Sequence, residues 1–254
     1  MKASATLSTL RNPPIVEAIL DIDCDLPPSQ DLEKIEAPAI ARYSERYPKL
    51  RIQYFQEHRL EAAPNAEPKI SVGKHGRKAL QFVSDDEKQL VQVRAEGFTF
   101  NRLTPYTSLD DYLPEIKRTW DIYASLTNPI QIRVIRLRYI NRILLPAHDN
   151  RVQLDTYFKV APHLPDESDL MFVGFLNQHI AIQHSTGYQV TTGLASQPQE
   201  ADKIPIVFDN GVACPEAGPV DDWPWILSKL EGLRDLKNLI FEQSLTPQCL
   251  NLYL

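Results

Sequence analysis

Arginine side chains recur along residues 131–145, where their spacing suits binding chemistry. In an extended chain successive side chains point to opposite faces. Alternation therefore places Arg136, Arg138 and Arg142 on one face, and Arg133, Tyr139 and Asn141 on the other. Guanidinium groups gathered on a sheet face can grip phosphates, or the acidic surface of a partner, through paired hydrogen bonds. The candidate binding residues are Arg136, Arg138, Arg142, Asn141 and Tyr139.

Carboxylates recur in the same way along an earlier strand-like segment, residues 15–24. Alternation places Glu17, Asp21 and Asp23 on one face of this segment. Such a cluster weakly indicates a binding site for a hard divalent cation. A metal-dependent nuclease or phosphohydrolase would require a site of this kind. It is equally consistent with one polar face of a sheet. If this strand pairs with the arginine strand, Glu17 and Asp21 neutralise the arginines as cross-strand ion pairs. We favour that structural interpretation over ligand contact.

The usual catalytic signatures are missing from the sequence. The chain has 9 glycines against 20 prolines in 254 residues, so glycine-built phosphate loops have few places to form. It contains no Gly-x-Ser elbow, no Gly-x-Gly pair, no Cys-x-x-Cys and no His-Glu-x-x-His. We therefore expect no catalytic residues, no bound metal and no cofactor, and the sequence leans away from an enzyme.

Charge and cysteine content restrict the surroundings of the protein. The formal net charge is −6, which excludes a dedicated nucleic-acid-coating protein and leaves room only for a local nucleic-acid site. Three widely separated cysteines fit a reducing compartment better than a disulfide framework. No signal peptide and no membrane-length apolar run is evident. We expect a cytoplasmic protein that does not contact a membrane.

Periodicity predicts the elements that position these side chains. Strands are expected at residues 15–24, 51–62, 79–84, 89–101, 131–145, 170–183, 188–194 and 204–208. Amphipathic helices are expected after Pro28-Ser29, after Asp110 or Asp111, and from Trp223 to about Gln243. The fold class is therefore α+β, with helices on one face of a mostly antiparallel sheet.

Two local signatures occur twice, in the same order and at similar spacing. Asn-Pro precedes the strands at residues 15 and 131, and Asp-Asp-aromatic opens the helices near residues 110 and 221. We interpret residues 1–127 and 128–254 as two fused β-α-β-β-β-α repeats, packed as one structural unit. Such repeats would form a curved, saddle-like sheet with a pseudo-twofold axis.

Four stretches together resemble a family of bacterial and archaeal proteins known for its sporadic distribution and without an established activity. The resemblance covers almost the whole chain. The stretches are Asn12 to Ile19, Phe98 to Leu103 with Pro105-Tyr106 and Asp110-Asp111, Arg138 to Ile143, and Phe241 to Pro247. The resemblance implies no cofactor or catalytic residue. Patchy distribution is typical of mobile modules, such as toxin–antitoxin or antiphage defence systems, and suggests regulation by protein partnership.

The sequence supports three hypotheses of different classes. The first is a non-enzymatic protein-binding or regulatory subunit, such as one of a toxin–antitoxin or antiphage defence module. Its partner would be another protein encoded by a neighbouring gene, with a second copy of the chain as a further partner. The second is a nucleic-acid-binding protein that uses the arginine strand, which is the less favoured partnership. The third is the metal-dependent nuclease or phosphohydrolase.

Overall fold

The computed structural model describes residue 10 and residues 12–28, 31–61, 69–147, 152–162 and 173–254. Within them, nine strands form a single antiparallel sheet in the order β2-β3-β4-β5-β1-β6-β9-β8-β7. The strands are β1 (Ile15–Asp25), β2 (Lys49–Glu61), β3 (Lys69–Val83), β4 (Gln89–Arg94), β5 (Gly97–Leu103), β6 (Gln131–Pro146), β7 (Leu176–Ile182), β8 (Gln189–Ser196) and β9 (Lys203–Cys214).

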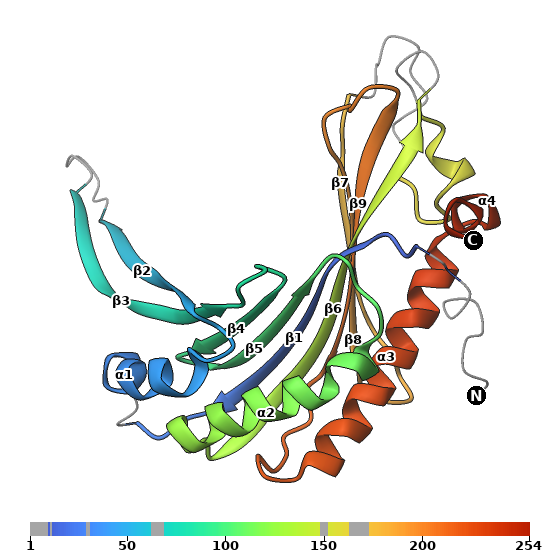
Figure 1. Cartoon of the computed structure of the whole chain (residues 1–254). Coiled ribbons are helices and arrows are strands. Elements are labelled where there is room, and N and C mark those ends of the chain that lie inside the picture. The colour runs from blue at the N-terminus through green and yellow to red at the C-terminus, as the bar shows by residue number, and fades with distance from the viewer. Residues whose placement is uncertain (1–9, 11, 29–30, 62–68, 148–151, 163–172) are drawn as a thin grey trace.

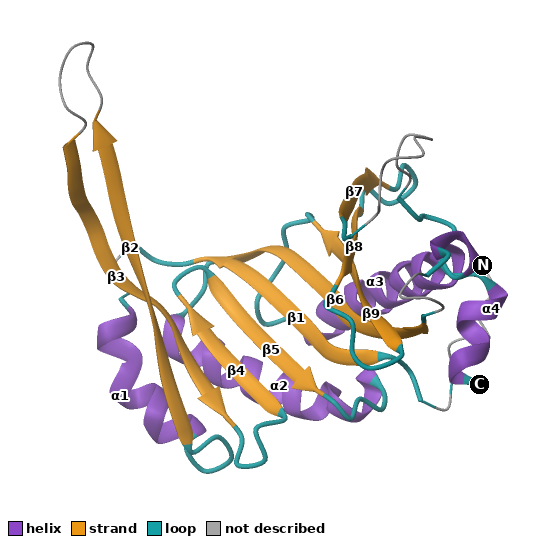
Figure 2. Cartoon of the chain, turned by 90° about the horizontal axis from the view of Figure 1, so that it is seen from above, coloured by secondary structure: helices purple, strands orange, loops and turns teal. Residues whose placement is uncertain are grey.

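The longer helices lie on one face of this curved sheet (Figures 1 and 2). The α-helices are α1 (Leu32–Tyr43), α2 (Leu109–Thr127), α3 (Trp223–Ser244) and α4 (Pro247–Leu250). Short 3-10 turns occur at Leu154–Thr156 and Asn251–Tyr253. The predicted class, α+β with helices on one face of an antiparallel sheet, is confirmed.

Alternation explains why β1 lies at the centre of the sheet. Its even-numbered side chains Ala18, Leu20 and Ile22 are buried in the core cluster that the helices cover. Its odd-numbered Glu17 and Asp21 point to the opposite face. β1 pairs with β6 so that Asp21 lies opposite Arg136. The acidic and the basic strand are therefore neighbours, as we expected if their charges neutralise each other across the two strands.

Helix α2 shows how local sequence sets the helical layer. Ser108 caps it by accepting a hydrogen bond from the N–H of Asp110, so the predicted cap at Asp110 or Asp111 was wrong by two residues or more. Tyr112, Ile116, Trp120 and Tyr123 are buried along one stripe, and Leu113, which we also assigned to this stripe, is half-buried. α3 begins at Trp223, as predicted, with the Asp222 carboxylate as its cap.

Three strand predictions need correction. Residues 89–101 form the hairpin β4–β5 and not one strand, because the chain turns at Ala95–Glu96. The predicted strand 79–84 is only the end of β3. β2 pairs along the whole of β3, and beyond the residues that also pair with β4 the two strands project from the sheet as a ribbon (Figure 1). The strand predicted at 170–183 begins at Leu176, and residues 170–172 lie outside the described part of the chain.

The order of elements also differs from the predicted repeat unit. The first half contains four strands after its first helix, not three. In the second half, only the 3-10 turn Leu154–Thr156 occurs between β6 and β7 in the described residues. The core divides into two apolar clusters, a large one under β1, β5 and β6 that includes residues of both halves, and a smaller one near Phe158, Phe208 and Phe241.

Candidate binding surface

The sheet face opposite α1, α2 and α3, called here the open face, has no helix over it in the described residues (Figure 2). It receives Glu17, Asp21 and Asp23 of β1 and three arginines of β6. Arg136, Arg138 and Arg142 all project from this face, as alternation predicted. Their side chains are 42%, 48% and 30% exposed.

Asp23 holds two of the arginines on the open face together. Its Oδ1 accepts a hydrogen bond from Arg94 Nη2 at 2.7 Å, and its Oδ2 accepts one from Arg136 Nη1 at 2.5 Å. The Asp23 side chain is 9% exposed. Burial alone would raise the pKa of Asp23, but the hydrogen bonds from Arg136 and Arg94 outweigh it and hold this pKa below its ordinary value.

Arg138 is bound by a different carboxylate, that of Asp209 on β9. Its Nε donates to Oδ1 at 2.7 Å, and its Nη2 donates to Oδ2, which gives the planar two-bond geometry favoured by guanidinium groups. The hydrogen bonds to Asp209 raise the pKa of Arg138 further. Gly211 lies directly opposite Arg138, and a Cβ there would stand 3.4 Å from the Arg138 Cγ. The glycine leaves room for the guanidinium to lie across the sheet.

Arg142 is the third of the predicted arginines and lies further along β6 than Arg136 and Arg138. Its Nη2 lies 2.5 Å from Glu200 Oε1, and its Nε donates to Gln197 Oε1 at 3.1 Å. Each predicted arginine therefore has a carboxylate partner. The prediction that Glu17 and Asp21 are the partners of these arginines was wrong in detail. Glu17 accepts a hydrogen bond from Asn101 at 2.6 Å, and Asp21 accepts one from Thr99 at 2.5 Å.

A chain of amide hydrogen bonds crosses the open face and was not anticipated from the sequence. Gln81 donates to Gln92 at 3.0 Å, Gln92 donates to Asn101 at 3.0 Å, and Asn101 donates to Glu17 at 2.6 Å. These residues come from β3, β4, β5 and β1. Amides at outward positions of neighbouring strands are the signal that would have revealed the chain. The chain of hydrogen bonds fixes the orientation of these side chains on the open face.

The open face is hollowed over β6, β9 and β8, with a volume of about 500 Å³. Such a volume falls within the range of ligand pockets, roughly 300–1,000 Å³. Small residues of β9, Gly211 and Ala213, line it. Gln178 and Gln189 contribute amide groups to the same lining. Other polar groups around the hollow are Asp21, Arg136, Arg138, Asp209 and Thr191.

Tyr139 and Asn141 lie on the helix-covered side of β6 and do not reach the hollow. They are 4% and 1% exposed. The Tyr139 hydroxyl contacts that of Tyr106, and Asn141 Nδ2 donates to the Phe208 carbonyl at 3.0 Å. Both belong to the packed interior, so the binding set reduces to the arginines.

The acidic residues of β1 are already engaged by neighbours. Within the described residues, no three histidine, cysteine or carboxylate side chains are grouped as a metal ion would require. Asp23 faces two arginines, while Glu17 and Asp21 accept hydrogen bonds from Asn101 and Thr99. The cluster therefore has the geometry of an ion-paired sheet face.

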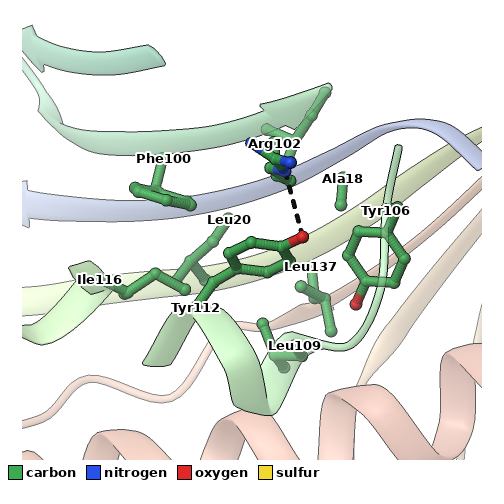
Figure 3. Close-up of a pocket in the computed structure, with 10 residues that line it drawn as sticks. Ala18, Leu20, Phe100, Arg102, Tyr106, Leu109, Tyr112, Ile116 and Leu137 are labelled. Atoms are coloured by element: carbon green, nitrogen blue, oxygen red, sulfur yellow. Dashed lines mark hydrogen bonds between the residues drawn. The ribbon is translucent and has the colours of Figure 1, made fainter. Parts of the chain in front are cut away.

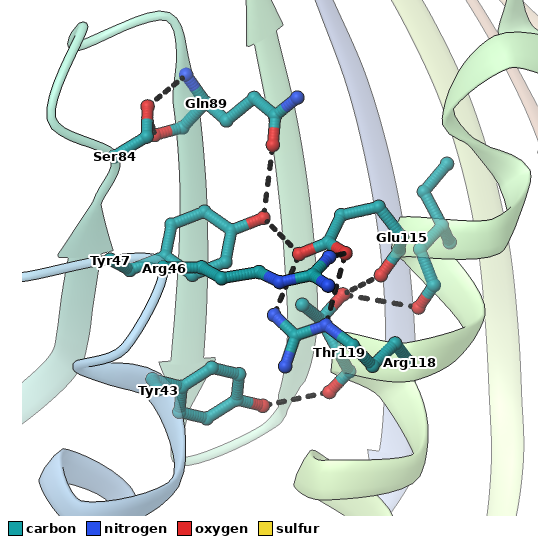
Figure 4. A network of polar contacts seen from close by, with 9 residues as sticks. Tyr43, Arg46, Tyr47, Ser84, Gln89, Glu115, Arg118 and Thr119 are labelled. Atoms are coloured by element: carbon teal, nitrogen blue, oxygen red, sulfur yellow. Dashed lines mark hydrogen bonds and ion pairs between the residues drawn. The ribbon is translucent and has the colours of Figure 1, made fainter.

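Two further features, a small apolar cavity and a polar network, lie on the helix side. A cavity of about 10 Å³ lies between α2 and the sheet near Arg102, Tyr106 and Tyr112 (Figure 3). That is room for about one water molecule. Glu115 on α2 binds Arg118 and Arg46 and lies 2.9 Å from the Tyr47 hydroxyl, which joins α2 to the end of α1 (Figure 4). Both features are structural.

Comparison with protein-family models finds no matching family, and comparison with curated proteins finds no match. The resemblance to the sporadically distributed family therefore stays a prediction. In the described part of the chain, no helix is both long and apolar enough to cross a membrane.

Proposed function

We propose that the chain is a non-enzymatic subunit that binds another protein on its open face. The observation that carries the proposal is the 500 Å³ hollow beside arginines that are ion-paired and still 42–48% exposed. Paired arginines are held in place, so a partner meets an ordered surface and loses less entropy on binding. Arginine is also enriched at the energetic centres of protein interfaces.

The charge balance around the hollow supports a protein partner over a nucleic acid. Arg94, Arg136 and Arg138 are matched by the carboxylates of Asp23, Asp209 and Asp21. Phosphate backbones are bound by an excess of positive charge and the release of counterions. A balanced set of charges instead suits the mixed surface of a folded protein, where it contributes specificity. The resemblance supports a partner encoded by a neighbouring gene, as in toxin–antitoxin or antiphage defence modules.

We propose in addition that residues 1–127 and 128–254 are duplicated halves related by a pseudo-twofold axis. The strand order supports this, because β5 flanks β1 as β9 flanks β6, and β4 and β8 come next on either side. β1 and β6 pair antiparallel at the centre, as a twofold axis between them requires. Superposition of the β1-β5-β4-β3 strands on β6-β9-β8-β7 tests the duplication; a mismatch of strand direction or register would contradict it.

Co-expression of the tagged chain with its native gene neighbours tests the protein-binding proposal. We expect one neighbour-encoded protein to co-purify. Arg138→Ala, which opens the Asp209 pair beside the hollow, should reduce its recovery at least tenfold. Arg234→Ala is the matched control, because Arg234 pairs with Asp110 on the helix side.

Two results would overturn the proposal. One is that no neighbour-encoded protein co-purifies, or that the same amount of it co-purifies with the Arg138→Ala variant as with the unaltered chain. The other is the recovery of nucleic acid that is released steeply as salt rises, which would establish the arginine strand as a phosphate-binding site.

A further inference from the structure

β7 is the last strand at its edge of the sheet. In the described residues its pairing partner is β8 alone. An edge strand presents unpaired backbone groups that can bond to a strand of another chain. This edge adjoins the open face, because Gln178 of β7 also lines the hollow, but pairing through its backbone does not require the arginine pairs.

The hydrogen bonds that flank β7 show which of its backbone groups face outward. Ser196 N donates to Phe175 O at 3.1 Å, and Gln183 N donates to Tyr188 O at 2.8 Å. In an antiparallel pair the hydrogen-bonded positions alternate with outward-facing ones. Since the bonded positions here are odd-numbered, the even-numbered residues point their N–H and C=O groups to the free edge. These residues are Leu176, Gln178, Ile180 and Ile182.

The same even-numbered positions carry exposed aliphatic side chains. Leu176 is 83% exposed, and Ile180 and Ile182 are each 65% exposed. Their partners on β8 include Thr191 and Ala195, which are too small to cover them. Apolar side chains and outward-facing backbone groups therefore coincide on one strand.

The two edges of the sheet differ in how they are protected. β2, at the far edge, carries the charged residues Lys49, Arg51 and Glu57. Charged edge strands discourage pairing with another chain. β7 contains no Asp, Glu, Lys or Arg. Only one of the two edges therefore lacks the protection that sheets ordinarily have.

From this geometry we infer that β7 pairs with β7 of a second copy of the chain, antiparallel, around a twofold axis at His179. This register sets Leu176 opposite Ile182 of the second copy, and Gln178 opposite its Ile180. The outward-facing residues then meet one another as hydrogen-bonded pairs, and all three aliphatic side chains of each copy gain a cross-strand neighbour. The strand is complementary to itself, which is what a twofold interface requires.

The size of the contact sets how tight the dimer is. A standard stable interface buries about 800 Å² on each partner. One seven-residue strand with three aliphatic side chains is smaller than that. The association is therefore reversible, and its extent depends on protein concentration. His179 lies opposite His179 of the second copy in a non-hydrogen-bonded pair, where side chains approach most closely.

Sedimentation of the purified chain over a hundredfold range of concentration tests the inference. The mass should rise from 29.0 kDa towards twice that value. Ile180→Lys should weaken dimerisation at least tenfold. Ile130→Lys is the matched control, because Ile130 is 64% exposed at a site remote from β7 in sequence and outside the sheet. Far-UV circular dichroism verifies that both variants are folded.

The position of the axis has its own test. His179→Glu should weaken the dimer by placing two carboxylates opposite each other, and mixing it with His179→Lys should restore dimers of the two variants. A monomer at every concentration, or a dimer unaffected by Ile180→Lys, would overturn pairing through β7. A dimer that Ile180→Lys disrupts but His179→Glu does not would overturn the twofold at His179.

Discussion

The Nζ of Lys237 lies 3.6 Å from the centre of the Tyr139 ring, in the buried layer between α3 and β6. Lys237 is 4% exposed, and its backbone carbonyl accepts a hydrogen bond from Asn210 Nδ2 at 2.8 Å. The aromatic face favours the charged form of the amine, whereas burial opposes it. Burial prevails, with the charge of Arg234 adding to it, and the pKa of Lys237 falls from its ordinary 10.5 to about 7.

This balance predicts a pH-dependent stability. Above pH 10.5 the lysine is neutral in both states and carries no penalty. As pH falls towards 7, the unfolded chain binds a proton that the folded chain does not, so stability decreases; below about 7 the penalty is complete. Lys237→Met should raise the free energy of unfolding at pH 7 by roughly 2–4 kcal/mol, and flatten its rise between pH 7 and 10.

Urea unfolding at pH 7 and pH 9.5 measures this effect. Lys117→Met is the control, because the Lys117 side chain is 45% exposed and lies over Trp223 at 5.8 Å. The control should leave the pH dependence unchanged. A destabilised Lys237→Met protein would show that the charged amine over Tyr139 contributes more than its burial costs.

A second prediction concerns Asp23 between its two arginines. Its lowered pKa means that the ionised carboxylate stabilises the folded protein above the ordinary value of 3.8, and that this contribution is lost as pH falls through the folded-state pKa. Asp23→Asn should cost about 1–3 kcal/mol at pH 7, less than a fully buried pair because Arg136 is 42% exposed. Its cost should shrink near pH 2. Thermal unfolding at both pH values, with the more exposed Asp25→Asn for comparison, measures the difference.

Local sequence was sufficient to predict one part of the fold. The α2 stripe of Tyr112, Ile116, Trp120 and Tyr123 repeats at helical spacing, and its burial follows from that spacing alone. The β4–β5 hairpin was missed, although its signal was present. Buried positions are odd-numbered at Val91 and Val93 but even-numbered at Phe98 and Phe100, and a turn must intervene to change the parity.

The candidate site divides in the same way. Alternation alone places Arg136 and Arg138 on one face, so their shared exposure was predictable. Their partners were not, because the pairing depends on side-chain reach across the register of three strands. Arg136 reaches Asp23 rather than the directly opposite Asp21, and Arg138 reaches Asp209 on β9. The hollow is lined by residues of β1, β6, β7, β8 and β9, whose side-by-side order a one-dimensional pattern does not specify.

The cysteines provide a third prediction, about reactivity. Cys24, Cys214 and Cys249 are all buried and free. Burial raises the pKa of Cys24 and of Cys249 to about 12, so the reactive thiolate is scarce at neutral pH. We expect a thiol reagent such as dithionitrobenzoate to modify none of the three cysteines in the folded protein at about pH 7.5, and all three once guanidinium chloride has unfolded it. Rapid labelling of one cysteine under native conditions would show that its part of the core opens.

A pair of glycines provides the last prediction, because their surroundings differ although both have positive φ. Gly97, at the β4–β5 turn, has φ +152°, and a Cβ there would lie 2.2 Å from the Ile22 carbonyl oxygen of β1. Gly187, at the β7–β8 turn, has φ +73° and no atom within 4 Å of the Cβ position. Gly187→Ala should cost about 1–2 kcal/mol, the strain of a left-handed residue alone. Gly97→Ala should cost more than about 3 kcal/mol, because it also displaces β5 from β1. Urea unfolding of both variants measures the gap, and equal costs would mean that the strands shift to admit the methyl group.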